Sequence, residues 1–149
     1  MRRWKRSAAL SGRRSLVQAA DITFPSTLGT VVHAVRDYLT DAGWSGVTTQ
    51  PELPDVKTAR MVTVADDGGV ARDGVQRRRH RFNIWANTPV DAENLGIAVA
   101  DAARSRLRMR EVVGPVKVTD DTDDVITVNG STLTHYLVTG VLIVRARNL

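Results

Sequence analysis

Apolar residues follow two different periods along the chain, and the helical period comes first. In FPSTLGTVVHAVRDYLTDAG (residues 24–43), they recur every three or four positions, which places them on one face of a helix. Pro25, followed by Ser26 or Thr27, supplies a start signal, and Gly43 supplies a stop signal. We therefore expect an amphipathic helix in this segment.

A second amphipathic helix is expected from about Pro89 to Arg108, with the proline in its first turn. Its inner stripe consists of Ala92, Leu95, Val99, Ala102, Ala103 and Leu107. Four arginines are expected in its last turns, where cations suit the negative end of the helix dipole: Arg104, Arg106, Arg108 and Arg110.

Between the two helices the apolar period changes to two, which is typical of β-strands. The segment KTARMVTVA (57–65) is expected to form a strand, and QRRRHRFNIWA (76–86) to return as its partner after a loop rich in Asp and Gly. A short strand is also predicted at 47–50. One face of the returning strand carries Phe82, Ile84 and Ala86, and the other face carries Arg81, Asn83 and Trp85.

The C-terminal part of the chain is expected to be β-structure throughout. The segment VGPVKVT is followed by an acidic loop, TDDTDD, and then by strands at 125–128 and 132–145. The pair Asn129-Gly130 is a strong hairpin signal and is expected to join these two strands.

The last predicted strand is apolar on both faces. One face carries Tyr136, Val138, Leu142 and Val144, and the other carries Leu137, Val141 and Ile143. A strand with one face in water would alternate apolar and polar residues. The helices can cover one face, so the other must be covered by a second layer of the same domain or by another subunit.

Composition limits the classes of protein that fit this chain. Its 149 residues suit a single domain, with hydrophobic and charged fractions of 42% and 25%. The absence of cysteine excludes disulfides, thiolate-bound zinc and a cysteine nucleophile. No apolar run is long enough for a membrane span, and no apolar signal-peptide core follows the basic start. We therefore expect a protein that has no membrane association and is made in the cytoplasm.

The net charge of +5 belongs to the N-terminus. Six of the 21 basic residues precede the first acidic residue, Asp21, and the other 15 are balanced by 16 acidic residues. We expect residues 1–21 to form a basic arm, and residues 22–149 to form the domain. A disordered, solubilising arm is favoured over a phosphate-binding one. The nucleic-acid candidates in the arm are Arg2, Arg3, Lys5, Arg6, Arg13 and Arg14.

Catalytic and ligand-binding motifs are missing from the sequence. The three histidines are scattered, and no Walker, GxGxxG or GxSxG motif is present. The acidic loop lacks the glycine and the distal glutamate of an EF-hand. We therefore expect no enzyme, no cofactor and no metal site. The four acids of this loop are Asp120, Asp121, Asp123 and Asp124.

The basic run RRRHR places Arg77, Arg79 and Arg81 on one face of its predicted strand. The simplest interpretation is a solvated strand end. A nucleic-acid site would need interleaved aromatic residues, and only Trp85 shares this face. In a third interpretation, the arginines meet the acidic loop of a neighbouring copy. Opposite charges on two edges of one domain would suit a head-to-tail contact, which can close into a ring.

The order of these segments resembles that of the tail terminator (tail completion) proteins of long-tailed bacteriophages, particularly those that infect actinobacteria. The resemblance covers about residues 24–147 and is strongest in RFNIWANTPVDAENLGIAVADAARSRL (81–107). There, a strand ending in Trp-Ala runs into a helix that opens with Asp-Ala-Glu-x-Leu. The family is defined by order and shape more than by invariant side chains.

The resemblance implies an α+β domain, with a mainly antiparallel sheet covered on one face by two helices. It implies a structural virion protein without catalytic residues, of which six copies form a ring on the tail tube. Such a ring ends polymerisation of the major tail tube protein and joins the tail to the capsid connector or head-completion protein, while DNA passes through its lumen. The interface candidates are Arg77, Arg79, Arg81, Trp85, Leu137, Val141, Ile143 and the four acids of the loop.

Two other functions stay open on the sequence alone. One is a different neck or minor tail protein, such as a head-closure protein, because these share small α+β domains. The other is a nucleic-acid-binding module that uses the basic arm and RRRHR. Whether the chain binds the tube protein or the connector would distinguish a tail terminator from another neck protein. The salt dependence of binding to duplex DNA would test the second alternative.

Overall fold

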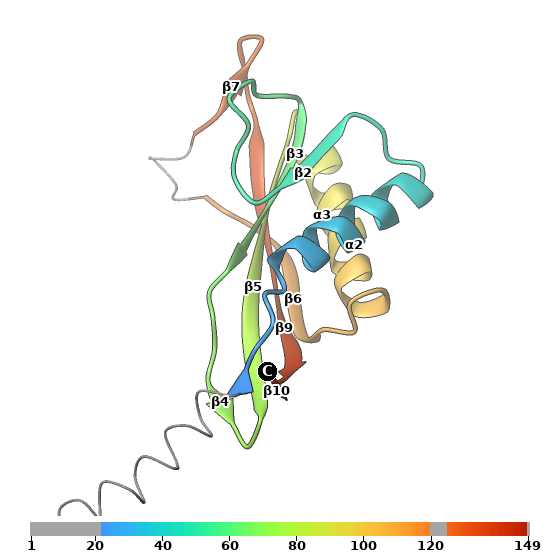
Figure 1. Cartoon of the computed structure of the whole chain (residues 1–149). Helices are drawn as coiled ribbons and strands as arrows, with labels where there is room; N and C mark the ends of the chain where they lie inside the picture. Colours follow the sequence, from blue (N-terminus) through green and yellow to red (C-terminus); the bar gives the residue numbers. More distant parts are fainter. Residues whose placement is uncertain (1–21, 120–124, 149) are drawn as a thin grey trace, which may run out of the picture.

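The structure is a computed structural model that describes residues 22–119 and 125–148, and its fold is α+β. A sheet with a mainly antiparallel arrangement forms its centre (Figure 1). The strands along this sheet are, in order, β2 (Val47–Gln50), β3 (Arg60–Asp66), β5 (Val75–Ala86), β9 (Thr134–Arg145) and β6 (Arg110–Lys117). β2 runs parallel to β3, the other neighbours are antiparallel, and the short β4 (Ala71–Arg72) pairs with β5.

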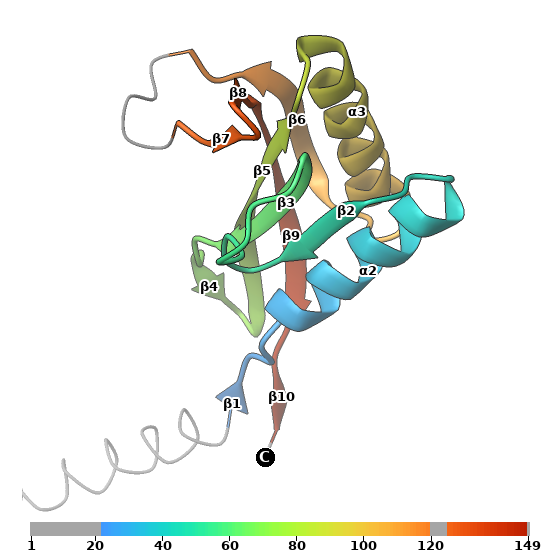
Figure 2. The same ribbon diagram turned by 90° about the horizontal axis from the view of Figure 1, so that it is seen from above.

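Helices α2 (Leu28–Asp41) and α3 (Pro89–Ser105) lie on the same face of this sheet (Figures 1 and 2). The N-terminus of α3 is capped because the hydroxyl of Thr88 accepts a hydrogen bond from the Asp91 N–H at 3.1 Å. α2 is followed by Gly43 at φ +89°, a conformation that glycine adopts without strain. The expected helical segments and the expected two-helix layer are therefore confirmed.

The main core fills the space between the helices and the sheet. The helical stripe of α2 contributes Val31, Val35 and Leu39, and the alternate residues Phe82 and Ile84 of β5 face it. All five are at least 98% buried. Full burial of a side chain of this size stabilises a fold by about 1.5–3 kcal/mol. The predicted α3 residues Ala92, Leu95, Val99, Ala102 and Ala103 are buried as well, while Leu107 is half-buried.

The end of α3 differs from the prediction. The helix ends at Ser105, and Arg108 has a positive φ of 53°, which breaks the helical backbone before β6 begins at Arg110. Of the four arginines expected in the last turns, only Arg104 lies in the last turn of the helix. The apolar period continues past the true end, so periodicity alone does not mark it.

The hairpin at Asn129-Gly130 is shorter than expected and is separate from the main sheet. β7 (Thr127–Val128) and β8 (Ser131–Thr132) pair only with each other, around two turn residues with φ 52° and 81°. The predicted pairing of 125–128 with 132–145 is therefore confirmed next to the turn, where Thr127 pairs with Thr132, but it does not extend along β9, which pairs with β5 and β6.

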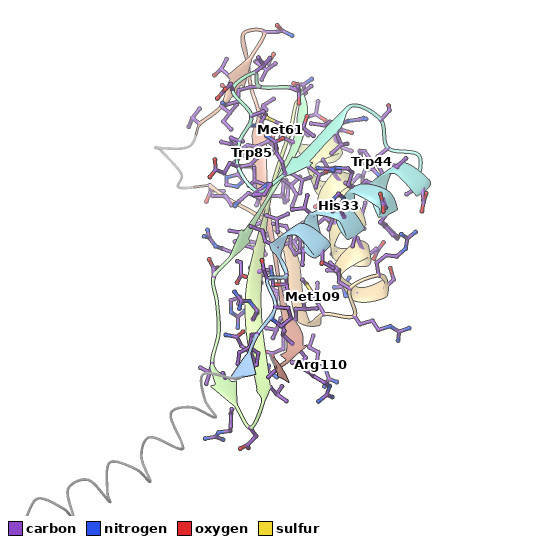
Figure 3. All side chains as sticks on the ribbon, viewed as in Figure 1. His33, Trp44, Met61, Trp85, Met109 and Arg110 are labelled. Atoms are coloured by element: carbon purple, nitrogen blue, oxygen red, sulfur yellow. The ribbon has the colours of Figure 1, made fainter. Side chains whose placement is uncertain are left out.

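This hairpin forms a second, smaller core on the sheet face opposite the helices (Figure 2). Ile126 and Leu133, which flank the hairpin, pack on Met61 of β3 and Trp85 of β5. In Figure 3, Met61 and Trp85 lie together near the end of the sheet that carries the hairpin. At this end, the second layer of the domain thus comes from the chain itself.

The two ends of the described domain also meet. β1 (Ile22–Thr23) pairs antiparallel with β10 (Arg147–Asn148), next to the start of α2 (Figure 2). The predicted basic arm (1–21) and the four acids of the predicted loop lie outside the described residues. Neither helix of the described part is long and apolar enough to cross a membrane.

Candidate interaction surface

The sheet face opposite the helices, called the open face below, is arranged in rows across three strands. Strand pairing fixes each row, because residues that are partners in an antiparallel pair point to the same face. Reading from β5 across β9 to β6, the rows are Arg79–Val141–Arg110, Arg81–Thr139–Val113 and Asn83–Leu137–Val116. Arg77 and Ile143 form a further pair at one end, and Trp85 and His135 at the other.

Two β-bulges place Arg110, Val113 and Val116 on this face, at every third position of β6. Glu111 and Gly114 have positive φ values of 51° and 112° at the irregular positions. A side chain at Gly114 would have its Cβ 2.5 Å from the Leu137 carbonyl oxygen, so this position requires glycine.

The same bulges turn two other residues of β6 towards the helices. Val112 packs against the main core. Pro115 approaches α3 so closely that a Cβ on Gly96 would lie 2.6 Å from its own Cβ. The bulges therefore let β6 seal the core on one side while it presents an arginine and two valines on the other.

The apolar part of the open face is partly exposed. Val113 and Val116 retain 56% and 53% of their surface, whereas Val141, between Arg79 and Arg110, retains 3%. The predicted interface residues Leu137 and Ile143 are half-buried and share the face of Val141, as the strand period indicated. Among the described residues, the second core covers only the Met61 and Trp85 end of this face.

The arginine stripe lies on β5, which is an inner strand of the sheet and not an edge strand. β9 pairs with β5 along its whole length, and β3 pairs with the part of β5 from His80 to Ala86. The side chains of these arginines lie on the surface of the sheet, and their contact with the acidic loop of a neighbouring copy stays a hypothesis, because that loop lies outside the described residues.

Two of the three arginines on this stripe have acidic partners in their own chain. Arg77 forms an exposed ion pair with Glu111, and Arg81 binds Asp67 through two hydrogen bonds of 2.8 and 3.1 Å. The hydrogen bond with Asp67 raises the pKa of Arg81 above its ordinary value, against a smaller effect of burial. Arg79 has no ion pair with any residue in 22–119 or 125–148.

The alternate residues of the basic run lie on the helix side, as the strand period predicts. Arg78 contacts Asp66 through a hydrogen bond of 2.9 Å, and His80 has no exposed surface. Burial favours the neutral carboxyl of Asp66, but hydrogen bonds from Arg78 and from the Gly68 N–H outweigh it and lower its pKa. These residues therefore stabilise the domain from within.

Trp85 shares the face of the arginines, as expected, but it is not available to a ligand. It is 4% exposed beneath the second core, and its ring stacks on His135 with centroids 4.5 Å apart. His135 is also within 2.9 Å of Asn83 through Nε2 and Oδ1. The tryptophan that shares the face of the arginine stripe is thus committed to packing within the described domain.

Sequence reasoning missed Arg110, Val113 and Val116 as surface residues. The helical pattern groups Arg110 with the last turns of the preceding helix, and the period-two pattern cannot follow a strand with two bulges. The dipeptide Gly114-Pro115 was the available signal, because glycine and proline inside a strand indicate a bulge or a strand at the sheet edge.

Other candidate ligand sites are weak. The described residues contain no group of three His, Cys, Asp or Glu side chains placed to hold a metal ion. A shallow depression of about 310 Å³ beside the stripe is lined by Asp67, Gly68, Gly69, Val70, Arg77, Arg79 and Val141. It belongs to the open face, and its lining mixes apolar, acidic and basic groups.

Comparison with known proteins finds no family model that matches this chain and no significant match among curated proteins.

Proposed function

We propose that this chain is a structural subunit of a bacteriophage tail that assembles with copies of itself into a ring. In this role it would sit at the head-proximal end of the tail tube, end polymerisation of the tube, and join the tail to the capsid connector. The proposal combines the segment order of residues 24–147 with the α+β arrangement of two helices on one face of the sheet.

The open face is the observation that carries this proposal. Val113 and Val116 are more than half exposed and lie in adjacent rows, with Arg110 in the row beyond Val113 and Asn83 at the far end of the Val116 row. An apolar surface rimmed by polar residues is typical of protein–protein contacts. This apolar surface continues onto the apolar residues of β9. The adjoining end of the open face is covered by the chain's own hairpin.

Electron microscopy of the purified chain, alone and with tail tubes of the phage that encodes it, tests the proposal. We expect rings with a central hole, and tubes that carry one added ring at one end and no longer elongate. A chain that stays monomeric and does not bind tube ends contradicts it. Binding to the connector but not to the tube would assign the chain to another neck position.

A nucleic-acid-binding module is less well supported. Burial of Trp85 removes the aromatic platform from the arginine stripe, and two of the three arginines are paired with acids. Phosphate contacts would also leave Val113 and Val116 in water. The arm residues that the sequence offered for this role lie outside the described part.

A further inference from the structure

We propose that the open face binds the outer face of helix α3 of a second copy of this chain. The inference rests on the proposed function, because it specifies the contact through which ring subunits would join. Its basis is charge complementarity between two surfaces that lie on opposite sides of the domain (Figures 1 and 2).

The open face presents two cations around an apolar centre. Arg79 of β5 and Arg110 of β6 lie on either side of Val141 of β9. The two arginines are therefore two strands apart, and their Cα atoms are about 10 Å apart. Neither arginine forms an ion pair with a described residue. The exposed Val113 occupies the next row. A partner that supplies two carboxylates around an apolar side chain would satisfy this surface.

The outer face of α3 has the complementary pattern. Ile97 is 45% exposed, and Glu93 and Asp101 lie one turn before it and one turn after it on the same helix face. These two acids are eight positions apart in the helix, which is about 12 Å along the axis. Glu93 forms no ion pair with a described residue, and Asp101 has only an exposed contact of 3.7 Å with Arg104.

The two surfaces carry opposite charges at similar spacing, and each has an apolar side chain between its charges. Arginines about 10 Å apart can each meet one of two acids about 12 Å apart, while Ile97 lies over Val141 and reaches Val113 in the next row. Such ion pairs would set the register, and the apolar contact would supply most of the affinity. Because the two surfaces differ, the contact is head-to-tail, and it closes into a ring where successive copies are suitably rotated.

Charge reversal on each surface tests the contact. The open-face variant carries Arg79→Glu and Arg110→Glu, and the helix-face variant carries Glu93→Arg and Asp101→Arg. A combined variant carries all four substitutions. The matched control carries Lys117→Glu and Asp55→Arg, which reverse two exposed charges on neither surface. Analytical ultracentrifugation measures assembly, and circular dichroism confirms that each variant is folded.

Each two-site variant is expected to assemble at least about 100-fold more weakly than the wild type, because like charges then face each other. An equimolar mixture of the two variants and the combined variant are both expected to regain assembly, while the control assembles normally. Rescue of this kind does not follow from a general loss of folding.

Two results overturn the inference and leave the proposed function intact. One is a folded open-face or helix-face variant that still forms rings like the wild type. The other is an open-face variant that no longer binds duplex DNA, as measured by fluorescence anisotropy, but assembles like the wild type. A wild-type chain that forms no ring, alone or on tail tubes, overturns the proposed function and this contact together.

Discussion

Oγ1 of Thr27 lies 3.3 Å from Nε2 of His80, a contact that joins the residue before α2 to the middle of the sheet. The hydroxyl of Thr27 does not cap its own helix, although threonine is common at this position. Oδ2 of Asp66 lies 4.0 Å from the same imidazole nitrogen, and Arg78 pairs with that carboxylate. The start of α2, β3 and β5 are thus connected through one histidine that has no exposed surface.

The stability of the domain should fall as the pH drops below the ordinary histidine pKa of about 6.5. Burial lowers the pKa of His80, although Asp66 partly opposes this effect. The unfolded chain therefore takes up the proton first, so this contribution is fully present above pH 6.5 and is lost as the pH falls towards the folded pKa. The slope reaches at most about 1.4 kcal/mol per pH unit.

Urea denaturation at pH 7.5, 6.5 and 5.5 measures this slope in the wild type, in His80→Gln and in His33→Gln. His33 is exposed on α2 and serves as the matched control. We expect His80→Gln to flatten the slope and His33→Gln to keep it. Asp66 does not contribute to this slope, because its pKa is lowered from the ordinary value of 3.8. The stability that its carboxylate provides is lost only as the pH falls below 3.8. An unchanged slope in His80→Gln would falsify the role of His80.

Removal of the Thr27 hydroxyl should destabilise the domain. Thr27→Val keeps the shape of the side chain but deprives His80 of its partner, and we expect a loss of about 1 kcal/mol in the free energy of unfolding. Thr27→Ser should recover most of this loss. Ser26→Ala, at the exposed neighbouring position, should change stability by less than about 0.5 kcal/mol. Equal effects of the substitutions at positions 26 and 27 would contradict the prediction.

Gly96 should not tolerate a methyl group. Gly96→Ala places a Cβ 2.6 Å from the rigid ring of Pro115, and we expect the loss from overpacking to exceed the gain in helix propensity by about 1–2 kcal/mol. Gly29→Ala is the matched control, because its Cβ would meet nothing within 4 Å. Thermal denaturation should show a lower Tm for the first variant and no such decrease for the second.

The second core should depend on Ile126. Ile126→Ala is expected to lower the free energy of unfolding by about 2–4 kcal/mol and to shift the fluorescence of Trp85 to longer wavelength, because the indole becomes hydrated. The adjacent Val125 is 59% exposed, and Val125→Ala should change stability by less than about 0.5 kcal/mol. Similar losses from both substitutions would show that this cluster does not cover the open face as described.

A charge at Val113 should prevent assembly without unfolding the domain. Val113 is 56% exposed, so Val113→Asp should leave the Tm almost unchanged. In the proposed ring contact, its carboxylate would be buried against an apolar and acidic surface, and assembly should weaken by at least about 100-fold. Val56→Asp, at a loop position that is 78% exposed and outside the rows of the open face, is the control for sedimentation. Rings that survive Val113→Asp would show that this valine lies outside the contact.

Much of the fold follows from the sequence because it depends on neighbours along the chain. The apolar periods of α2, α3 and β5 identified these elements and the faces of their side chains correctly. Gly43 and the Asn129-Gly130 turn were recognised from local backbone preference. Even so, the same local signal at Asn129-Gly130 did not reveal that the hairpin pairs only with itself.

The candidate surface was harder to predict because it joins residues far apart in the sequence. Its rows combine β5, β9 and β6, and the bulges of β6 change which of its residues reach the open face. The acidic partners of the stripe, Asp67 and Glu111, come from a loop and from a bulge. Nothing local to the arginines marks these partners, since each pairing depends on how the strands align.

The sequence by itself determined the two amphipathic helices, the alternating faces of β5 and the two-sided apolar character of β9, because each follows from side-chain periodicity over a few residues. Only the tertiary structure decided that the arginine stripe is central rather than at an edge, that Trp85 is buried, and that β6 exposes Arg110, Val113 and Val116. The physical reason is that strand order, register and bulges are set by contacts between distant segments, and these contacts decide which side chains remain in water.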